Sequence, residues 1–292
     1  MTNTCICSAI CTPLDDRERL HVDGLQDHLR DQTEAGIDAI LVGGTMGQMQ
    51  LLTEKTYAEL VRAACDFWSR GEIFVGVGDT SLSRTLQRIH IVNEFKVDGV
   101  LALAPFFFQF SQEELCDYYR ALADQSKSPL YLYDIPPRTG TILEIETVVE
   151  LATHPNIAGI KCSGPITQTR ELIDALGARK FRVMVGCPTL LDHLLRVGIA
   201  QHVDGLYALA PRVACAIARS AQSENWSEAA RLTQILGRLL ATLQEYGVFP
   251  AAQEILRAKG TRGCFLPRPY RPLSNERTRQ LLAEPAIQAI LN

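Results

Sequence analysis

The chain has 292 residues, of which 47% are hydrophobic and 21% charged, and its formal net charge is −4. The length allows one large domain or two small ones with a full-sized core. The 29 lysines and arginines are scattered without a basic block, which excludes a nucleic-acid footprint or a membrane-binding face and leaves a small molecule as the expected partner.

The N-terminus and the cysteines favour a cytoplasmic protein. No N-terminal stretch combines basic residues with a long apolar core, and the most apolar run, VLALAPFFFQF at 100–110, is too short to span a bilayer. The nine cysteines lie between Cys5 and Cys264 without CxxC pairs, as is typical of reduced thiols packed in a core. The segment CICSAIC at 5–11 raises a metal site as an alternative, but no histidine follows at ligand spacing, so we expect no metal.

Eight short apolar runs alternate with amphipathic segments along the chain. Glycine, proline or small polar residues follow each run, as is typical of strand ends. The runs lie at 5–10, 38–44, 73–78, 98–105, 129–136, 156–163, 181–187 and 203–211. The segments between them carry apolar residues three and four positions apart, and several open on Ser or Thr, as helix N-caps do.

This strict alternation predicts an α/β fold with a parallel sheet, and eight units match a closed (β/α)8 TIM barrel. An open, doubly wound sheet is the alternative, but VGVGDT at 75–80 lacks the third glycine of a dinucleotide-binding loop. Residues 212 to about 290 have helical patterns only. We therefore expect a barrel catalytic domain over 1–211, whose closing helix runs into the next segment, and a C-terminal helical region over 212–292.

Residues suited to chemistry follow several of the predicted strands. Such barrels carry their active sites at the carboxyl ends of the strands, so we expect these residues to gather at one end. The glycines of GGTMGQ at 43–48 let backbone N–H groups approach an anion closely. The candidates are Gly44 and Thr45 after the second strand, Tyr133 and Arg138 after the fifth, Lys161 at the end of the sixth, and Gly186, which opens GCPT after the seventh.

Lys161 is the candidate with the most specific chemistry. A lysine in a mostly apolar barrel mouth is favoured as the neutral amine, which attacks ketones and turns a 2-keto acid into a nucleophilic enamine. A phenol at Tyr133 can carry the protons, and the planar guanidinium of Arg138 suits a carboxylate. Each residue alone also has an ordinary explanation, as a surface lysine, a core tyrosine or a surface ion-pair partner, and only their joint arrival at one barrel end favours an active site.

Three motifs in order resemble the dihydrodipicolinate synthase and N-acetylneuraminate lyase family. GGTMGQMQLLTEKTYAEL at 43–60 resembles its GTTGE-x-x-x-L-[ST]-x-x-E segment, YLYDIPPRTG at 131–140 its YN-[IV]-P-x-R-T-G, and GIKCSG at 159–164 its GIK-[DE]-x-x-G. The match runs from about Ala9 to the ALAP at 208–211. Three ordered motifs at consistent spacing are a specific signal.

The resemblance implies an eight-stranded barrel with a C-terminal helical extension, usually a homotetramer built as a dimer of dimers. It implies that Lys161 forms a Schiff base with pyruvate and that Tyr133 transfers protons, without metal or organic cofactor. Thr45 corresponds to the first threonine of GTTGE, near the pyruvate carboxylate. Arg138 corresponds to the arginine that holds the carboxylate of the aldehyde substrate in the synthases.

Two departures from the family pattern affect the proton relay. Met46 stands where the synthases carry a second threonine, and Phe107 stands where a neighbouring subunit lends a tyrosine. Neither side chain relays a proton, which argues against dihydrodipicolinate synthesis itself. The sialic acid lyase branch fits less well, since its pattern has an uncharged residue at the place of Arg138. The phenylalanines at 106–108 indicate either an apolar aldehyde or subunit packing.

We therefore expect a cytoplasmic, Schiff-base-forming lyase or synthase, of the class I aldolase type, which condenses or cleaves pyruvate or another 2-keto acid with an aldehyde. An aldolase or dehydratase of a 2-keto-3-deoxy sugar acid, using the same lysine imine, is one alternative. A barrel that binds a keto acid without turning it over is another.

Overall fold

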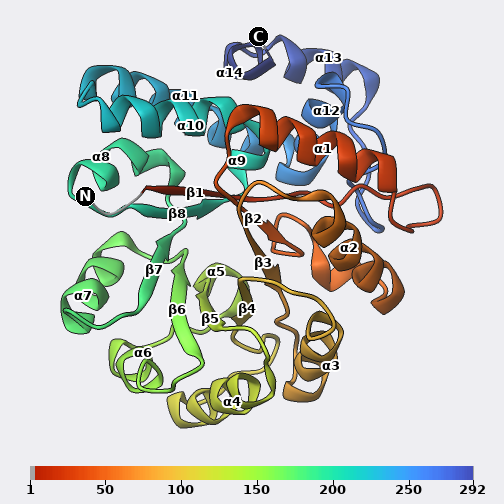
Figure 1. The fold of residues 1–292 in the computed structure, drawn as a ribbon. Coiled ribbons are helices and arrows are strands. Elements are labelled where there is room, and N and C mark those ends of the chain that lie inside the picture. Colours follow the sequence, from red (N-terminus) through yellow and green to blue (C-terminus); the bar gives the residue numbers. More distant parts are fainter. Residues whose placement is uncertain (1–3, 292) are drawn as a thin grey trace. The chain divides into compact units, whose positions relative to one another are not determined.

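The computed structural model describes residues 4–291 and contains the predicted TIM barrel (Figure 1). Eight strands close in sequence order, and every strand pair of known register is parallel. The strands are β1 (Cys5–Ala9), β2 (Ala39–Val42), β3 (Glu72–Gly76), β4 (Gly99–Leu103), β5 (Leu130–Asp134), β6 (Ile157–Cys162), β7 (Arg182–Val185) and β8 (Gln201–Asp204).

The chain forms two compact units. The central unit is the continuous segment Glu72–Cys187, and the terminal unit contains the chain up to Gly71 and from Pro188 onward. The central helices are α3 (Leu82–Val92), α4 (Gln112–Gln125), α5 (Pro136–Thr139), α6 (Ile145–Leu151) and α7 (Ile166–Leu176). The terminal unit has α1 (Val22–Ala35), η1 (Met49–Leu51), α2 (Glu54–Phe67), η2 (Pro188–Leu190), α8 (Leu191–Arg196), α9 (Leu206–Leu209), α10 (Pro211–Gln222), α11 (Trp226–Tyr246), α12 (Val248–Ala258), α13 (Asn275–Ala283) and α14 (Pro285–Leu291).

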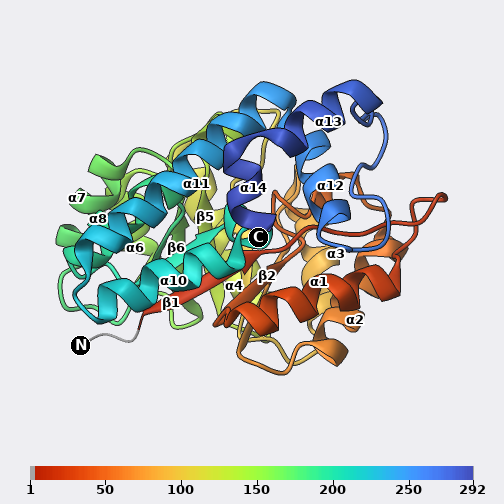
Figure 2. The same cartoon turned by 90° about the horizontal axis from the view of Figure 1, so that it is seen from above.

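The segment after residue 211 contains the predicted C-terminal helices, but it is not helical throughout, because residues 259–274 between α12 and α13 form turns and extended chain. It begins with α10 and α11, which lie side by side along much of their length in both views (Figures 1 and 2). The apolar faces of both helices are buried, including Leu236, Leu239 and Leu243 of α11. A division of the chain at residue 211 into a barrel domain and a helical region stays a prediction.

Helices α2 and α4 begin at the predicted Thr and Ser caps, whereas α3 begins two residues earlier than predicted, after Ser81 instead of Ser83. The side chains of Thr53, Ser81 and Ser111 each accept a hydrogen bond from a backbone N–H of the first turn. At Ser111 the cap is reciprocal, because Glu114 also accepts a hydrogen bond from the Ser111 N–H at 2.7 Å. These bonds satisfy donors that would otherwise lack a partner inside the helix.

Strands β4 and β5 of the central unit are buried along their whole length, as expected of parallel strands covered on both faces. Successive side chains of a strand point to opposite faces. On β6, Ile160 and Cys162 line a pocket with Thr169 and Leu172 of α7. Lys161, between them in sequence, therefore points to the other face, into the barrel.

Two glycines make room for a tyrosine inside the barrel. A Cβ at Gly99 would lie 2.6 Å from the Tyr131 ring, and one at Gly159 would lie 2.7 Å from the same ring and 2.2 Å from the carbonyl oxygen of Arg182. The Tyr131 ring also packs edge-on against Phe74, with 5.3 Å between the ring centroids. Tyr131 and Gly159 precede Tyr133 and Lys161 by two residues on the same strand faces, so this packing forms the layer beneath them.

The eighth strand ends earlier than predicted. A strand was expected over 203–211, but β8 spans Gln201–Asp204 and residues Leu206–Leu209 form the short helix α9. The Asp204 carboxylate accepts a hydrogen bond from the Leu206 N–H at 2.8 Å, which turns the backbone directly after the strand. The apolar run LYAL therefore continues as a helix, since an apolar run by itself does not distinguish a strand from a buried helix.

Within the described range 4–291, no helix combines the length and the apolar content that crossing a bilayer requires. A cytoplasmic location stays a prediction from the sequence.

We predict that Gly159→Ala lowers the free energy of unfolding by about 2 kcal/mol or more, because the added methyl group overlaps a backbone oxygen that cannot move aside. Gly237→Ala in α11 is the matched control, since a Cβ there meets no atom within 4 Å. It should raise the free energy of unfolding by about 0.5 to 1 kcal/mol through helix propensity. Urea unfolding of both variants tests this, and equal stability of Gly159→Ala and the wild type would contradict it.

Candidate active site

Lys161 and Tyr133 lie directly opposite each other on neighbouring strands of the central unit. Their Cα atoms are partners in the β5–β6 register, and the Lys161 Nζ lies 4.2 Å from the centroid of the Tyr133 ring. Each residue is only 4% exposed. The amine therefore lies inside the barrel, shielded from solvent and in contact with an aromatic ring.

A bulge between β5 and β6 creates this pairing. Leu130 is opposite Ile157, but the next residue, Tyr131, is opposite Gly159, so Ala158 is an extra residue in β6. Without the extra residue, Tyr133 would face Ile160 and Lys161 would be displaced by one position. The bulge therefore brings the amine and the phenol to the same level of the barrel.

β7, the strand on the other side of β6, places Gly186, a third predicted site residue, beside the end of β6. Met184 of β7 is the register partner of Lys161, and the Gly186 N–H donates a hydrogen bond to the Cys162 carbonyl at 2.8 Å. Gly186 thus follows directly at the carboxyl end of the β6–β7 pair. The central unit brings Tyr133, Lys161 and Gly186 to the carboxyl ends of three consecutive strands.

The glycine-rich loop 43–48 of the terminal unit follows the carboxyl end of β2. Gly44 is buried, and Thr45 is half-buried and accepts a hydrogen bond from the Gln48 N–H at 3.1 Å. The Thr12 hydroxyl donates to the Gly47 carbonyl at 2.8 Å. A Cβ at Gly47 would come within 3.1 Å of the Ile10 carbonyl, so this glycine permits the close approach of loop and strand.

Met46 packs against the end of β8 within the same unit. A Cβ at Gly205 would lie 3.0 Å from the Met46 Cβ and Cγ and 3.2 Å from its sulfur, so the glycine provides the space for the thioether. Met46 has no hydroxyl, and its contact with Gly205 is apolar.

Arg138 and Phe107 are both on the surface of the chain. The Arg138 side chain, in α5, is exposed and forms no hydrogen bond or ion pair with any residue of 4–291. Phe107 is 84% exposed and Phe108 is 65% exposed, and their rings pack edge to face with 5.0 Å between centroids. Phe107 also has a φ of +85°, a strained conformation for a bulky residue. No described contact joins either residue to Lys161.

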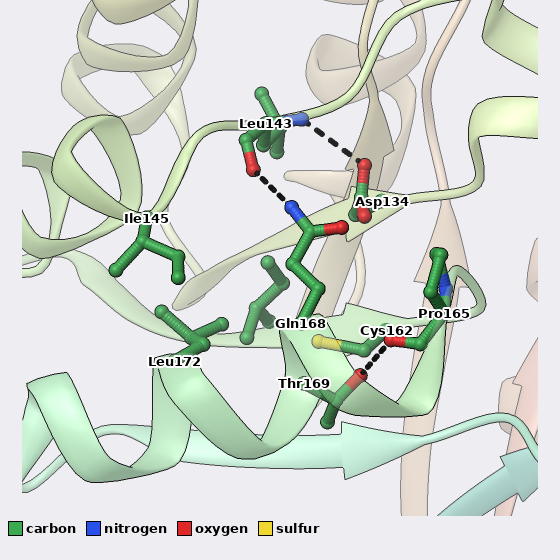
Figure 3. A pocket seen from close by; sticks show the side chains of 9 residues that line it. Asp134, Leu143, Ile145, Cys162, Pro165, Gln168, Thr169 and Leu172 are labelled. Carbon is green, nitrogen blue, oxygen red and sulfur yellow. Dashed lines mark hydrogen bonds between the residues drawn. The ribbon is translucent and has the colours of Figure 1, made fainter.

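Asp134 lies on the helix-facing side of β5, one residue after Tyr133. Its carboxylate lines a narrow pocket with Cys162, Leu143, Gln168 and Thr169 (Figure 3). The Leu143 N–H donates to Asp134 Oδ1 at 3.2 Å, and the Gln168 amide donates to the Leu143 carbonyl at 3.2 Å. Asp134 is buried, and this burial raises its pKa to about 6 although the Leu143 bond lowers it.

Burial also raises the pKa of the Cys162 thiol to about 12, and the charge of Asp134 acts in the same direction. The thiol is therefore neutral at physiological pH and is not suited to act as a nucleophile.

We predict that Asp134→Asn is more stable than the wild type at pH 7 but not at pH 4. The folded pKa of Asp134 is raised from 3.8 to about 6, so the folded protein binds a proton between these values that the unfolded chain has lost. Wild-type stability contributed by this group therefore falls as the pH rises from about 4 to about 6. The difference between variant and wild type should reach up to about 3 kcal/mol at pH 7.

Urea unfolding between pH 4 and pH 7 measures this difference. Asp117→Asn, which removes an exposed carboxylate from the same unit, is the control and should show no such growth with pH. A constant difference between Asp134→Asn and the wild type across this range would contradict the prediction.

Sequence reasoning missed three residues around the site. Asp134 was not among the candidate residues, although its place next to a buried strand tyrosine is a signal of burial. Gly205, which accommodates Met46, and Gln253, a fully buried amide in α12, were not singled out. A polar residue within the apolar face AAQEIL is the signal that could have found Gln253.

Among residues 4–291 there is no group of three or more His, Cys, Asp or Glu side chains arranged to hold a metal ion. The chemistry available in the described residues is that of a buried primary amine, a phenol on the next strand and a glycine-rich loop. A primary amine condenses with a carbonyl compound, and a phenol moves the protons that this condensation requires.

A closed (β/α)8 barrel with a buried lysine beside a tyrosine at the strand ends has the architecture of a class I aldolase. The chain belongs to the dihydrodipicolinate synthetase family, whose model matches residues 2–288. It is therefore an enzyme of the class I lyase and synthase type, in a family that uses pyruvate as a substrate.

Comparison with individual proteins agrees with this assignment. The chain is 30% identical to 4-hydroxy-tetrahydrodipicolinate synthase 1 of Streptomyces coelicolor over 280 residues, which are 94% of this chain and 90% of the relative. A dihydrodipicolinate synthase structure from Bacillus anthracis has a TM-score of 0.91 at 24% identity, covering 99% of both chains. A variant of the Sulfolobus solfataricus 2-keto-3-deoxygluconate aldolase, solved as a pyruvate complex, has a TM-score of 0.88 at 22% identity, covering 98% of this chain and 96% of the aldolase. The two structural similarities support the fold.

Proposed function

We propose that this enzyme joins or splits pyruvate and an aldehyde through a Schiff base on Lys161. The observation that carries the proposal is the contact between the buried Lys161 amine and the Tyr133 ring, which lie opposite each other at the barrel interior. The family assignment supports pyruvate, or another 2-keto acid, as the first substrate.

In this reaction the neutral Lys161 amine attacks the ketone carbon of pyruvate, and the adduct takes up a proton from the acid Tyr133 and loses water to give a protonated imine. The imine withdraws electrons, so the methyl group of pyruvate loses a proton and an enamine forms. The enamine carbon then bonds to the aldehyde carbon, and the aldehyde oxygen takes up a proton. Hydrolysis of the imine releases the product and restores the free amine; cleavage runs through the same steps in reverse.

Tyr133 is our proposed acid and base for these steps, because its ring contacts the amine that forms the imine. We assign pyruvate carboxylate binding to Gly44 and Thr45, since the backbone of a glycine-rich loop offers N–H donors to an anion. Gly186 is proposed to border the substrate, because it follows directly at the strand end beside β6.

We further propose that the second substrate is not the aldehyde used in dihydrodipicolinate synthesis, although relatives carry that name. Met46 and Phe107 lack the hydroxyl groups that a three-residue proton relay needs, and Met46 instead makes an apolar contact with Gly205. An aldolase or a dehydratase of a 2-keto-3-deoxy sugar acid would use the same imine. In the dehydratase the enamine expels a hydroxide, so product analysis distinguishes the two.

A homo-oligomer, arranged as a dimer of dimers, is part of this proposal. The exposed Phe107 and Phe108 rings present apolar area that another copy of the chain would cover. We also propose that the enzyme acts in the cytoplasm.

The first test is to trap the imine. We expect pyruvate and borohydride to leave a reduced pyruvate adduct on Lys161, identified by mass spectrometry of the digested protein. Lys161→Met should give no adduct, while Lys180→Met, which removes an exposed lysine, should react like the wild type. An adduct absent from the wild type, or present on another lysine, would overturn the proposal.

The role of Tyr133 is tested with Tyr133→Phe, which should lower kcat for the best aldehyde or sugar acid by about a hundredfold or more. Tyr131→Phe is the matched control, because it removes a hydroxyl from the same strand face one layer below, and it should retain kcat within a few-fold. A protein that traps pyruvate on Lys161 but turns over no aldehyde or sugar acid would instead be a keto-acid-binding barrel.

We predict that Arg138 selects second substrates that carry a carboxylate. Its exposed guanidinium has no ion-pair partner among residues 4–291, so it is available to a substrate anion. Arg138→Ala should raise KM for carboxylate-bearing aldehydes about ten- to a hundredfold, the effect of losing a charge-assisted hydrogen bond. Uncharged aldehydes should change little.

Steady-state kinetics with aldehyde pairs that differ only in the carboxylate measure this selection. Arg170→Ala is the control, since Arg170 is exposed and already paired with Asp174 at 3.1 Å. Equal changes in KM for both members of a pair would show that Arg138 does not read the carboxylate.

A further inference from the structure

The glycine-rich loop 43–48 is hydrogen-bonded to the C-terminal part of the chain at Phe265. The Gln48 amide nitrogen donates to the Phe265 carbonyl at 3.2 Å. The Phe265 N–H in turn donates to Gln253 Oε1 at 2.5 Å. Both bonds are buried. Gln48, at the end of the loop, therefore binds the carbonyl of Phe265, and Gln253, in α12, binds its N–H.

The backbone at Gln48 has an unusual conformation. Gln48 has a φ of +53°, a left-handed conformation that side chains rarely adopt, and its N–H closes the turn on the Thr45 carbonyl at 3.1 Å. The other side of the loop is fixed by the Thr12 hydroxyl on the Gly47 carbonyl. Thr12, which follows β1, therefore holds the loop at Gly47, and Phe265 holds it at Gln48.

Phe265 itself is rigidly placed. Its side chain is buried and packs edge-on toward His28 of α1, with 6.2 Å between ring centroids. The preceding residue, Cys264, exchanges two backbone hydrogen bonds with Leu14, at 2.7 and 2.8 Å. The residue that receives the loop is thus fixed to two other segments of the terminal unit.

The orientation of both amides follows from these bonds. Gln48 must direct its nitrogen to the Phe265 carbonyl, and Gln253 must direct its oxygen to the Phe265 N–H. The other amide atoms, Gln48 Oε1 and Gln253 Nε2, are buried without a hydrogen-bond partner among the described residues. Two apolar side chains would avoid the desolvation of these atoms, so the amides stabilise a particular arrangement rather than the core as such.

We propose that Gln48 and Gln253 are positioning residues that hold loop 43–48 in its pyruvate-binding conformation through Phe265. The inference rests on the proposed function, in which the backbone donors of this loop bind the pyruvate carboxylate. It assigns to the C-terminal part of the chain a role in substrate binding, because Phe265 and Gln253 fix Gln48 at the end of the loop that contains Thr45.

The test uses Gln48→Met and Gln253→Met, which keep side-chain length and remove the hydrogen bonds. Pyruvate dependence is measured by the rate of borohydride trapping on Lys161. Each variant should raise the half-saturating pyruvate concentration about tenfold, the effect of one lost hydrogen bond, and leave the trapping rate at saturating pyruvate within twofold of wild type. A merely structural role would lower the thermal midpoint without this selective effect on pyruvate.

Gln32→Met is the matched control. Gln32 is also fully buried, donates one hydrogen bond to a backbone carbonyl, that of Ala208 at 3.2 Å, and has an amide oxygen without a partner in the described chain. It is not bonded to the loop, so its loss should not change pyruvate half-saturation. The double variant of Gln48 and Gln253 should raise half-saturation by less than the product of the single effects, because both act through Phe265.

Gln253→Glu provides a second variant in case the methionine variants fail to fold. Its carboxyl group retains an oxygen acceptor for the Phe265 N–H in either protonation state, so half-saturation should stay within a few-fold of wild type. The inference is overturned if wild-type Lys161 is trapped but Gln48→Met and Gln253→Met shift half-saturation no more than Gln32→Met. Failure of wild-type trapping would instead overturn the proposed function.

Discussion

The register between β5 and β6 is the constraint on which the proposed chemistry depends. Side chains of a strand alternate between the two faces, so a shift of one residue would turn Lys161 from the barrel interior to the side of α7. The extra residue Ala158 is what brings Lys161 opposite Tyr133. A local irregularity of the sheet thus determines that an amine and a phenol meet, and the two strands then hold them with little freedom to move.

The layer of side chains beneath Lys161 and Tyr133 is closely packed and supports this pair. Gly99 and Gly159 leave just enough space for the Tyr131 ring, which supports the level of Tyr133 and Lys161 from below. On the opposite face of β5, Asp134 is buried at a cost, as its raised pKa indicates, and its carboxylate fixes the segment that follows α5 through the Leu143 N–H. Functional positions commonly carry such locally unfavourable groups, because the surrounding fold is stable enough to hold them.

The barrel was predictable from the sequence because its signals are local. Apolar runs, glycine-rich strand ends and Ser or Thr caps each depend on a few neighbouring residues, and they predicted the eight strands and the starts of α2 and α4. The run LYAL at 206–209 was misassigned, because the backbone turns directly after β8, where Asp204 accepts a hydrogen bond from the Leu206 N–H, and an apolar run alone does not distinguish a strand from a buried helix. The sequence indicated only that Lys161 and Tyr133 both lie at strand ends, and it did not predict that they pair directly. The bulge at Ala158 has no sequence signature of its own.

Contacts between distant segments were beyond sequence reasoning for a different reason. Gln48 and Phe265 are separated by 217 residues, and nothing near either one indicates the other. Likewise, Met46 and Gly205 fit each other only once β2 and β8 both flank β1. Such contacts are determined by the closure of the fold, and a single sequence does not reveal them.

The division of the chain into a continuous and a discontinuous unit has a consequence for its biosynthesis. All residues of the central unit, with the β5–β6 pair among them, have left the ribosome once Cys187 has emerged. The terminal unit draws on both ends of the polypeptide, and the peptide group that Gln48 bonds is translated among the last segments. During translation Lys161 and Tyr133 can therefore come together before Phe265, which binds the glycine-rich loop, has been synthesised.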